Sequence, residues 1–167
     1  MVRHSEDGHG RVAHSKERKE VIEMARMEAS AVINRPIDEV FAYLIDVRNW
    51  SQWAGFPEAE QTSEGAVGVG ATFRGVSQFL GRRAEWTSEV TKYEPNRMME
   101  QKITWGGMSI EQSLTFEPVE GGTRLTMAGE AETGGFFKLA EPVVNRMMQR
   151  QLEGNLANLK DILEAQA

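Results

Sequence analysis

The side chains that most often carry out acid–base, nucleophilic or metal chemistry are confined to one short part of this sequence. All three histidines, His4, His9 and His14, lie within the first 23 residues, and the chain contains no cysteine. The remainder of the chain therefore cannot form a Ser–His–Asp or Cys–His arrangement. The five-residue spacing of the histidines does not stack them on one helical face. We expect no metal site and no cofactor.

Carboxylates are the other side chains that could act as a general acid or base. Glu85, Glu89, Glu111 and Glu117 alternate with apolar residues, which predicts that they lie on the solvent-facing side of strands. No phosphate-binding loop of the G-x-x-x-x-G-K type is present. The sequence thus favours binding over catalysis and leaves enzymatic activity open.

Apolar and aromatic residues alternate with polar ones along the segments 82–94, 98–105, 108–119 and 123–133, as in strands with one buried face. Three polar residues, Ser88, Gln101 and Gln112, interrupt the otherwise apolar rows. They could bond to one another across neighbouring strands or contact a ligand, because a buried amide needs a partner. Met and aromatic residues in such rows most often fill a core, but they also suit a cavity wall. The expected cavity residues are Phe73, Trp86, Ser88, Met99, Gln101, Ile103, Trp105, Ile110, Gln112, Leu114, Met127, Val143, Val144, Met147 and Met148.

The segment 135–167 has apolar residues at helical spacing, which predicts one long amphipathic helix. Such a stripe needs an equally long apolar surface, and the alternating segments can supply it. Further elements are predicted as a strand over 24–33, a helix over 36–45, a second short helix or turn over 46–53, and strands over 59–66 and 70–80. Short glycine turns such as 106–107 join the strands, so we expect an antiparallel meander.

Composition places the chain among single-domain globular proteins. Its length of 167 residues suits one core, and its net charge of −6 argues against nucleic acid as a partner. No apolar run approaches the length of a membrane span, and the first ten residues lack the apolar region of a signal peptide. We expect a cytoplasmic protein in which 1–23 is a polar, disordered tail and 24–167 forms the domain.

The ordered series of short motifs resembles one protein superfamily. The motifs are Ile33-Asn34-Arg35-Pro36 with Glu39-Val40-Phe41, the sequence WSQW at 50–53, Val69-Gly70, Val90-Thr91-Lys92-Tyr93-Glu94-Pro95, Phe116-Glu117-Pro118, Gly121-Gly122-Thr123-Arg124-Leu125 and Asn155-Leu156-Ala157-Asn158-Leu159-Lys160. They are similar to the START-related superfamily, also called SRPBCC, which includes the polyketide cyclase/dehydrase and lipid-transport group and the birch-pollen-allergen fold. The resemblance covers about residues 24–165.

The resemblance implies an α+β helix-grip fold. A curved seven-stranded antiparallel sheet would wrap on the long C-terminal helix, and two short helices would follow the first strand. The resemblance also implies an apolar cavity for lipid-like or polycyclic ligands, with Trp50 and Trp53 near its mouth. Such motifs carry fold rather than substrate.

Three functions remain open on the sequence. The first is binding or transport of a small hydrophobic ligand, favoured by the apolar rows and the lack of His and Cys after residue 23. The second is a cyclase/dehydrase-type enzyme that works by shaping a reactive chain. The third is an interaction protein whose cavity is filled by its own side chains. Oligomeric state is left open.

Overall fold

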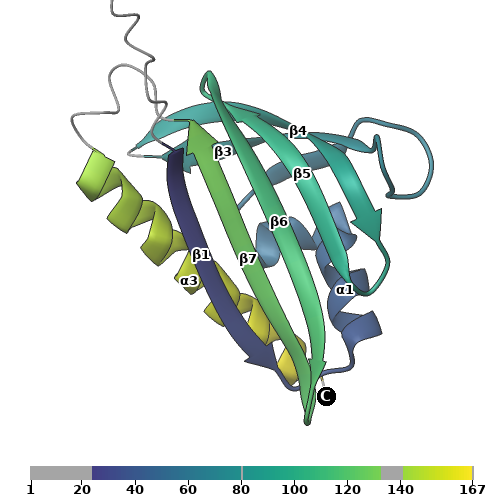
Figure 1. Cartoon of the computed structure of the whole chain (residues 1–167). Coiled ribbons are helices and arrows are strands. Elements are labelled where there is room, and N and C mark those ends of the chain that lie inside the picture. Colours follow the sequence, from purple (N-terminus) through teal and green to yellow (C-terminus); the bar gives the residue numbers. More distant parts are fainter. Residues whose placement is uncertain (1–23, 80, 133–140, 167) are drawn as a thin grey trace, which may run out of the picture.

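The computed structural model describes residues 24–79, 81–132 and 141–166, which form a curved sheet and a set of helices on its inner side (Figure 1). The predicted N-terminal tail and the residues 133–140 between the last strand and the long helix lie outside the described residues. The elements are β1 (Met24–Ile33), α1 (Ile37–Ile45), the 3-10 helix η1 (Val47–Asn49), α2 (Trp50–Trp53), β2 (Glu58–Gln61), β3 (Thr72–Phe79), β4 (Arg82–Glu94), β5 (Met98–Trp105), β6 (Met108–Val119), β7 (Gly122–Glu132) and α3 (Glu141–Ala165).

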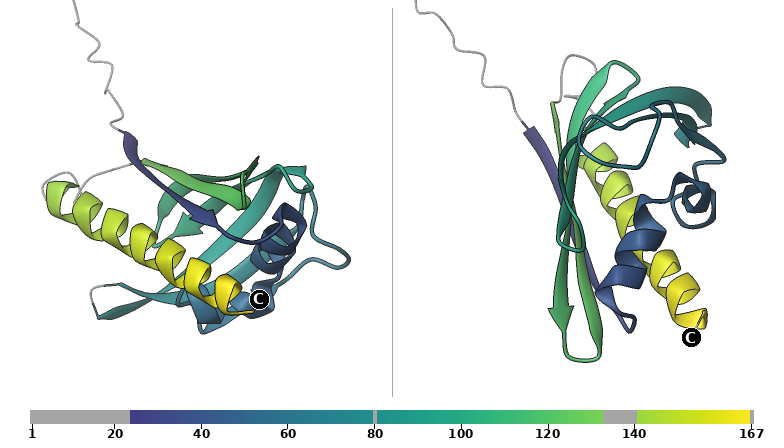
Figure 2. Two further views of the ribbon diagram at one scale, coloured as in Figure 1. Left: turned by 90° about the horizontal axis from the view of Figure 1, so that it is seen from below. Right: turned by 90° about the vertical axis from the view of Figure 1, so that its right-hand side faces the viewer.

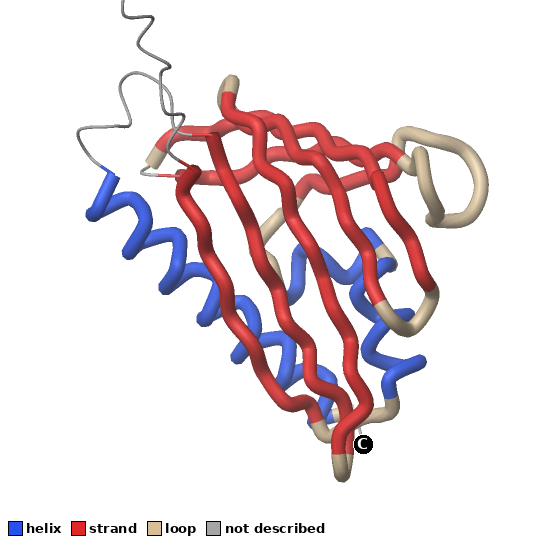
Figure 3. The backbone as a smooth tube through the Cα atoms, in the orientation of Figure 1, coloured by secondary structure: helices blue, strands red, loops and turns tan. Residues whose placement is uncertain are grey.

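The seven strands form one antiparallel sheet in the order β1-β7-β6-β5-β4-β3-β2. Each strand from β2 to β7 pairs with its neighbour in sequence, and β1 closes the far edge by pairing with β7. The smooth backbone trace shows the strands bending together over the helices (Figure 3). The predicted helix-grip fold is therefore confirmed.

Local sequence explains the tight connection between β5 and β6. Gly106 and Gly107 have φ values of 54° and 84°, the left-handed conformation that a two-residue hairpin of type I′ requires at both positions. The turn fixes the register in which Trp105 faces Met108 and Gln101 faces Gln112. The glycine pair thus sets which inner-row side chains become neighbours.

Differences from the expected elements are confined to the glycine-rich part and the ends. β2 is shorter than the expected strand over 59–66, and the segment after it is a loop. The segment 46–53 divides into η1 and α2, where the Asp46 carboxylate accepts a hydrogen bond from the Arg48 N–H at 3.0 Å. This cap starts a new helical turn and so separates α1 from α2.

The hydrophobic core lies where α1 and the C-terminal half of α3 meet the sheet. Phe41 of α1 packs its ring against Phe116 at 5.0 Å and Tyr93 at 5.7 Å between centroids. Leu156, Leu159 and Leu163 of α3 are buried in the same core. Two further views show α3 running along the sheet with α1 and α2 beside its C-terminal half (Figure 2). This end of the molecule is closed.

Candidate functional site

The candidate site is the inner face of β4, β5, β6 and β7, where strand pairing brings most of the predicted cavity residues together. The cross-strand partners include Trp86 with Trp105, Ser88 with Ile103, Gln101 with Gln112, Ile103 with Ile110, and Leu114 with Met127. The alternation along β4 runs as predicted, because Trp86 and Ser88 are buried while Glu85, Thr87 and Glu89 are exposed. The pairing register of the strands therefore brings these inward-facing side chains, which we call the inner rows, next to one another.

Burial changes along these rows. Near the closed end Phe73, Met99, Leu114 and Met127 are each at most 5% exposed. Toward the other end of the same strands Ile103, Trp105, Ile110 and Gln112 are only half-buried. Side chains that face inward and still reach solvent mark the end of the sheet that the described helices do not cover, which we call the open end.

The long helix shows the same change, and here the structure corrects the sequence interpretation. Val143 and Met147 were expected to face the sheet, but they are 65% and 40% exposed. Val144 and Met148 are half-buried. The apolar stripe is continuous, but the sheet surface it contacts is fully enclosed only along the C-terminal half, so the first turns of α3 keep solvent contact.

Trp50 also differs from the expectation of a place near a cavity mouth. It is 6% exposed, and its indole Nε1 donates to the Leu44 carbonyl oxygen at 2.7 Å. Its ring lies 4.9 Å from that of Phe73. Trp50 is thus a core residue that ties α2 to the end of α1. Trp53 is half-buried and packs on the edge of the same core.

Polar atoms gather in the middle of the inner face. The Gln101 Nε2 donates to Gln112 Oε1 at 2.5 Å, so the two amides bond across β5 and β6. Within the described part of the chain, Ser88 Oγ and Gln101 Oε1 are buried without a hydrogen-bond partner, as are the indole Nε1 atoms of Trp53 and Trp86. Buried polar atoms are rarely left unpaired in proteins, so each of these calls for an explanation.

Gly75 stands opposite Trp86 on β3, and of the bulge, bend or close backbone approach that a glycine inside a strand can indicate, the close approach is found here. A Cβ atom at Gly75 would lie 2.5 Å from Trp86 Cζ2 and 2.7 Å from the Glu58 carbonyl oxygen. The indole therefore lies directly over the glycine backbone, close to the Phe56 and Trp50 rings. A glycine directly across from an inward tryptophan was the available signal, but it needed the strand register.

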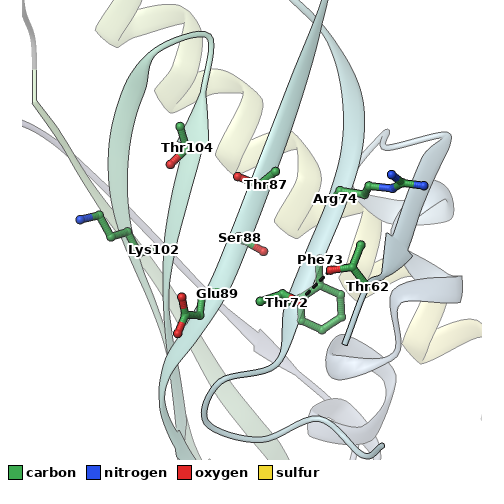
Figure 4. A pocket seen from close by; sticks show the side chains of 9 residues that line it. All are labelled: Thr62, Thr72, Phe73, Arg74, Thr87, Ser88, Glu89, Lys102 and Thr104. Atoms are coloured by element: carbon green, nitrogen blue, oxygen red, sulfur yellow. Dashed lines mark hydrogen bonds between the residues drawn. The ribbon is translucent and has the colours of Figure 1, made fainter. Parts of the chain in front are cut away.

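Two depressions lie on the outside of the described structure. One of about 370 Å³ is on the outer face of β3, β4 and β5, lined by four threonines, Arg74, Glu89 and Lys102, and its lining also includes Phe73 and Ser88 of the inner rows (Figure 4). Thr62 and Thr72 bond through their hydroxyls there at 2.7 Å. Another of about 340 Å³ lies at the tip around Arg35, Pro36 and Pro118. Neither brings together a set of side chains that could act in catalysis.

Titratable groups near the site are few. Burial raises the pKa of Tyr93, and the pKa of Tyr43 is raised by burial and then by the nearby Asp46 charge, so both phenols stay neutral at pH 7. The Arg48 guanidinium hydrogen-bonded to Asp46 lowers the pKa of that carboxyl. Among residues that the structure describes, no cluster of His, Cys, Asp or Glu is arranged to hold a metal ion.

No helix among the described residues combines the length and apolar character needed to cross a membrane.

A family model described as polyketide cyclase/dehydrase and lipid transport matches residues 24–164. The chain belongs to this family. The match spans the described domain from its first strand almost to the end of α3, and it confirms the predicted SRPBCC relationship. No curated protein matches the chain significantly.

Solved structures share the fold of this family member at low sequence identity. The protein TTHA0849 from Thermus thermophilus is 20% identical with a TM-score of 0.73, over 85% of this chain and 99% of that one. The Zhui aromatase/cyclase from Streptomyces sp. R1128 is 17% identical with a TM-score of 0.71, over 85% and 94%. Ara h 8.0201 is 14% identical with a TM-score of 0.66, over 86% and 99%. At these identities the likeness establishes the fold alone.

Proposed function

We propose that this protein binds a small hydrophobic ligand, lipid-like or polycyclic, between the first turns of α3 and the inner rows of β4 to β7. The observation that carries the proposal is the change in burial along those rows. Ile103, Trp105 and Ile110 face inward but keep solvent contact, whereas Leu114 and Met127 on the same or neighbouring strands do not. Apolar side chains on a concave face that remain partly wet are typical of a ligand site.

Chemistry at the site supports binding rather than group transfer. The inner rows of the described strands β4, β5 and β6 combine thioether, aliphatic and indole groups with two amides, the Ser88 hydroxyl and the Tyr93 phenol. Flexible methionines such as Met99, Met127 and Met148 adapt to ligands of irregular shape. Membership in a family of polyketide cyclases and hydrophobic-ligand binders is consistent with this use.

Cyclase-type chemistry is the second candidate, and the unpaired Ser88 and Gln101 atoms favour it. An enzyme can accelerate a ring closure by holding a reactive chain in a folded shape, without a nucleophile of its own. The structurally similar Zhui protein is named an aromatase/cyclase. Any such activity would use the same inner face, so binding is the step to test first.

The test fills the site at one residue. Gly129 is buried on β7 opposite Gln112, and a Cβ there would meet its nearest atoms, Ile110 Cγ2 and Met27 Cε, only at 3.9 Å. Gly129→Leu should therefore place a side chain in the site without a backbone clash. We expect the neutral probe N-phenyl-1-naphthylamine to bind the native chain and quench tryptophan emission, and to bind Gly129→Leu at least tenfold more weakly.

The matched control is the same substitution on the far side of the molecule. Gly154 lies on the exposed face of α3, and a Cβ there has no heavy atom within 4 Å. Gly154→Leu should keep native probe affinity. If the folded native chain takes up no apolar probe, and native mass spectrometry finds no co-purified ligand, the binding function is wrong and a self-filled interaction protein becomes the better account.

A further inference from the structure

We infer that the ligand carries a neutral hydroxyl group, rather than a carboxylate, and that this group lies against Ser88 and Gln101. The inference rests on the proposed function and specifies the chemical class of the molecule bound. Its basis is a pair of buried oxygen atoms on neighbouring strands that no described group satisfies, together with the absence of charge around them.

The two residues are close neighbours on the inner face. Ser88 pairs with Ile103 across β4 and β5, while Gln101 pairs with Val90, so the two side chains are diagonal partners. Diagonal neighbours on one face of an antiparallel pair are within reach of a shared small group. Ser88 is 5% and Gln101 8% exposed. A polar group of a bound molecule at this depth would be shielded from water.

The hydrogen-bonding capacity of Ser88 and Gln101 indicates which polar group of a ligand would bond to them. Gln101 Oε1 is an acceptor and needs a donor, whereas the Ser88 hydroxyl can donate or accept. The two amides could also exchange roles, with Gln112 donating to Gln101, and Gln101 would then offer an N–H instead. A hydroxyl donates and accepts at once, so it satisfies Ser88 and Gln101 in either arrangement.

The lack of a positive charge near Ser88 and Gln101 argues against a carboxylate as the polar group of the ligand. Along the inner rows of the described strands, the residues beside this pair are Trp86, Val90, Met99, Ile103 and Gln112, none of them ionised. Tyr93 faces the same side, and burial raises its pKa, so it stays neutral. A carboxylate bound here would lose its hydration without gaining a counter-charge.

The cations of β4 and of the first turns of α3 lie toward solvent, and Arg146 and Arg150 of α3 are exposed. By the alternation along β4, Arg82 lies on the same inward face as Ala84 and Trp86. It is the first residue of the strand, however, and it is exposed. The Lys160 ammonium of α3 is engaged by the Val32 carbonyl oxygen at 2.5 Å and by Glu164 at 2.7 Å. The unpaired Trp86 Nε1 belongs to a ring that packs on Gly75 of β3.

Displacement of N-phenyl-1-naphthylamine by three ligands that share one twelve-carbon chain tests the inference on the full chain. These are 1-dodecanol, which donates and accepts; methyl dodecanoate, which is neutral and only accepts; and dodecanoate, which is charged. We expect dodecanol to displace the probe at a concentration at least tenfold below that of dodecanoate, with methyl dodecanoate between them.

Variants connect this preference to the two residues. The double variant Ser88→Ala with Gln101→Leu should bind dodecanol at least tenfold more weakly than the native chain. Its affinity for the apolar probe should stay within about twofold of the native value. The control variant Thr87→Ala with Lys102→Met removes a hydroxyl and an ammonium group from the outer face of the same two strands. It should leave the affinities for dodecanol and for the probe unchanged. If the double inner-face variant does not fold, Ser88→Ala alone should still lower the affinity for dodecanol several-fold.

The outcomes separate the two proposals. Dodecanoate binding as well as dodecanol, or a dodecanol affinity unchanged by the inner-face variants, would overturn the hydroxyl inference while leaving hydrophobic binding intact. Tight dodecanoate binding that is lost in Arg82→Ala would overturn it as well, since the polar head would then lie at the rim. Failure of every ligand and of the probe itself would instead refute the proposed function.

Discussion

At the scale of single residues, the inner face is set by the alternation along each strand and by close contacts with the facing strand. Trp86, Ser88 and Val90 of β4 are buried, while Glu85, Thr87 and Glu89, which alternate with them, are exposed. Which face of a strand a side chain occupies depends only on its position along the extended chain, because successive side chains point to opposite faces. What the alternation could not reveal was how close a partner strand comes, as at Gly75, because that depends on which residue stands opposite.

The close approach at Gly75 leads to the first prediction. Gly75→Ala would place a Cβ 2.7 Å from a backbone oxygen of Glu58 as well as against the Trp86 ring, and a backbone atom cannot move aside cheaply. We expect a loss of about 1–3 kcal/mol in unfolding free energy, the usual cost of overpacking. Urea denaturation followed by tryptophan fluorescence measures it.

Gly68→Ala is the matched control, since a Cβ at Gly68 has no heavy atom within 4 Å. This control should stay within about 0.5 kcal/mol of the native chain, as most surface substitutions do. Equal stability of the two variants would show that the Trp86 ring and β2 can shift away from position 75, and that this contact is not tight in solution.

At the scale of elements, the strand pairs were predicted well because short turns leave few alternatives. The bounds of β1, β4, β5 and β6 coincide with those expected from alternation and glycine turns. The long helix was predicted as an element, but its contacts were not. Helical periodicity shows which face is apolar, and it does not show how far along that face a partner surface extends.

The β5–β6 turn carries the second prediction. Gly107 has a φ of 84°, where a side chain is strained, so Gly107→Ala should destabilise the domain by about 1 kcal/mol. Gly106 has a φ of 54°, which asparagine tolerates, so Gly106→Asn should be nearly neutral. Thermal unfolding of the two variants, measured side by side, checks this; a neutral Gly107→Ala would indicate that the turn relaxes.

A different element contact, between α3 and the free edge of β1, carries the third prediction. Gln149 Nε2 donates to the Glu28 carbonyl oxygen at 2.8 Å, and the Asn34 N–H donates to the Glu164 carboxylate at 2.9 Å. Side chains of the helix thus satisfy backbone groups that an edge strand leaves open. The Lys160 hydrogen bond, followed by that of Asn34, lowers the pKa of Glu164.

The sign of the pH effect follows from that lowered pKa. The ionised form of Glu164 is favoured in the folded state, so its contribution is complete above the unfolded-state value, about 4.3, and is lost as pH falls through the lower folded-state value. Glu164→Gln should be less stable than the native chain at pH 7, and the difference should shrink below about pH 4. Glu120→Gln, in the exposed β6–β7 turn, should show no such trend; a pH-independent Glu164 difference would contradict the ion-pair account.

At the scale of the whole molecule, the sequence predicted the architecture better than the site. Element order and length indicated a sheet wrapped on a helix, because few other arrangements bury so long an apolar stripe. The division into a closed end and an open end could not be predicted. Leu159 and Val144 both belong to the apolar stripe of the helix, yet Leu159 is buried and Val144 only half-buried.

This division yields the last prediction, which separates stability from binding. Leu159 has no exposed surface, so Leu159→Ala removes packed atoms from an enclosed core and should cost about 2–5 kcal/mol of unfolding free energy. Val144 is half-buried at the open end, so Val144→Ala should cost less than about 1 kcal/mol. Urea unfolding with both variants and the native chain measures the two costs.

Probe binding should rank the same two variants in the opposite order. Val144 belongs to the proposed wall, so its truncation changes the shape of the site and should shift the affinity for N-phenyl-1-naphthylamine several-fold. Leu159→Ala, measured at a temperature where it stays folded, should bind as the native chain does, because its cavity opens in the closed end. If Leu159→Ala alters binding while Val144→Ala does not, the ligand enters the closed core, and the inner rows at the open end are not the site.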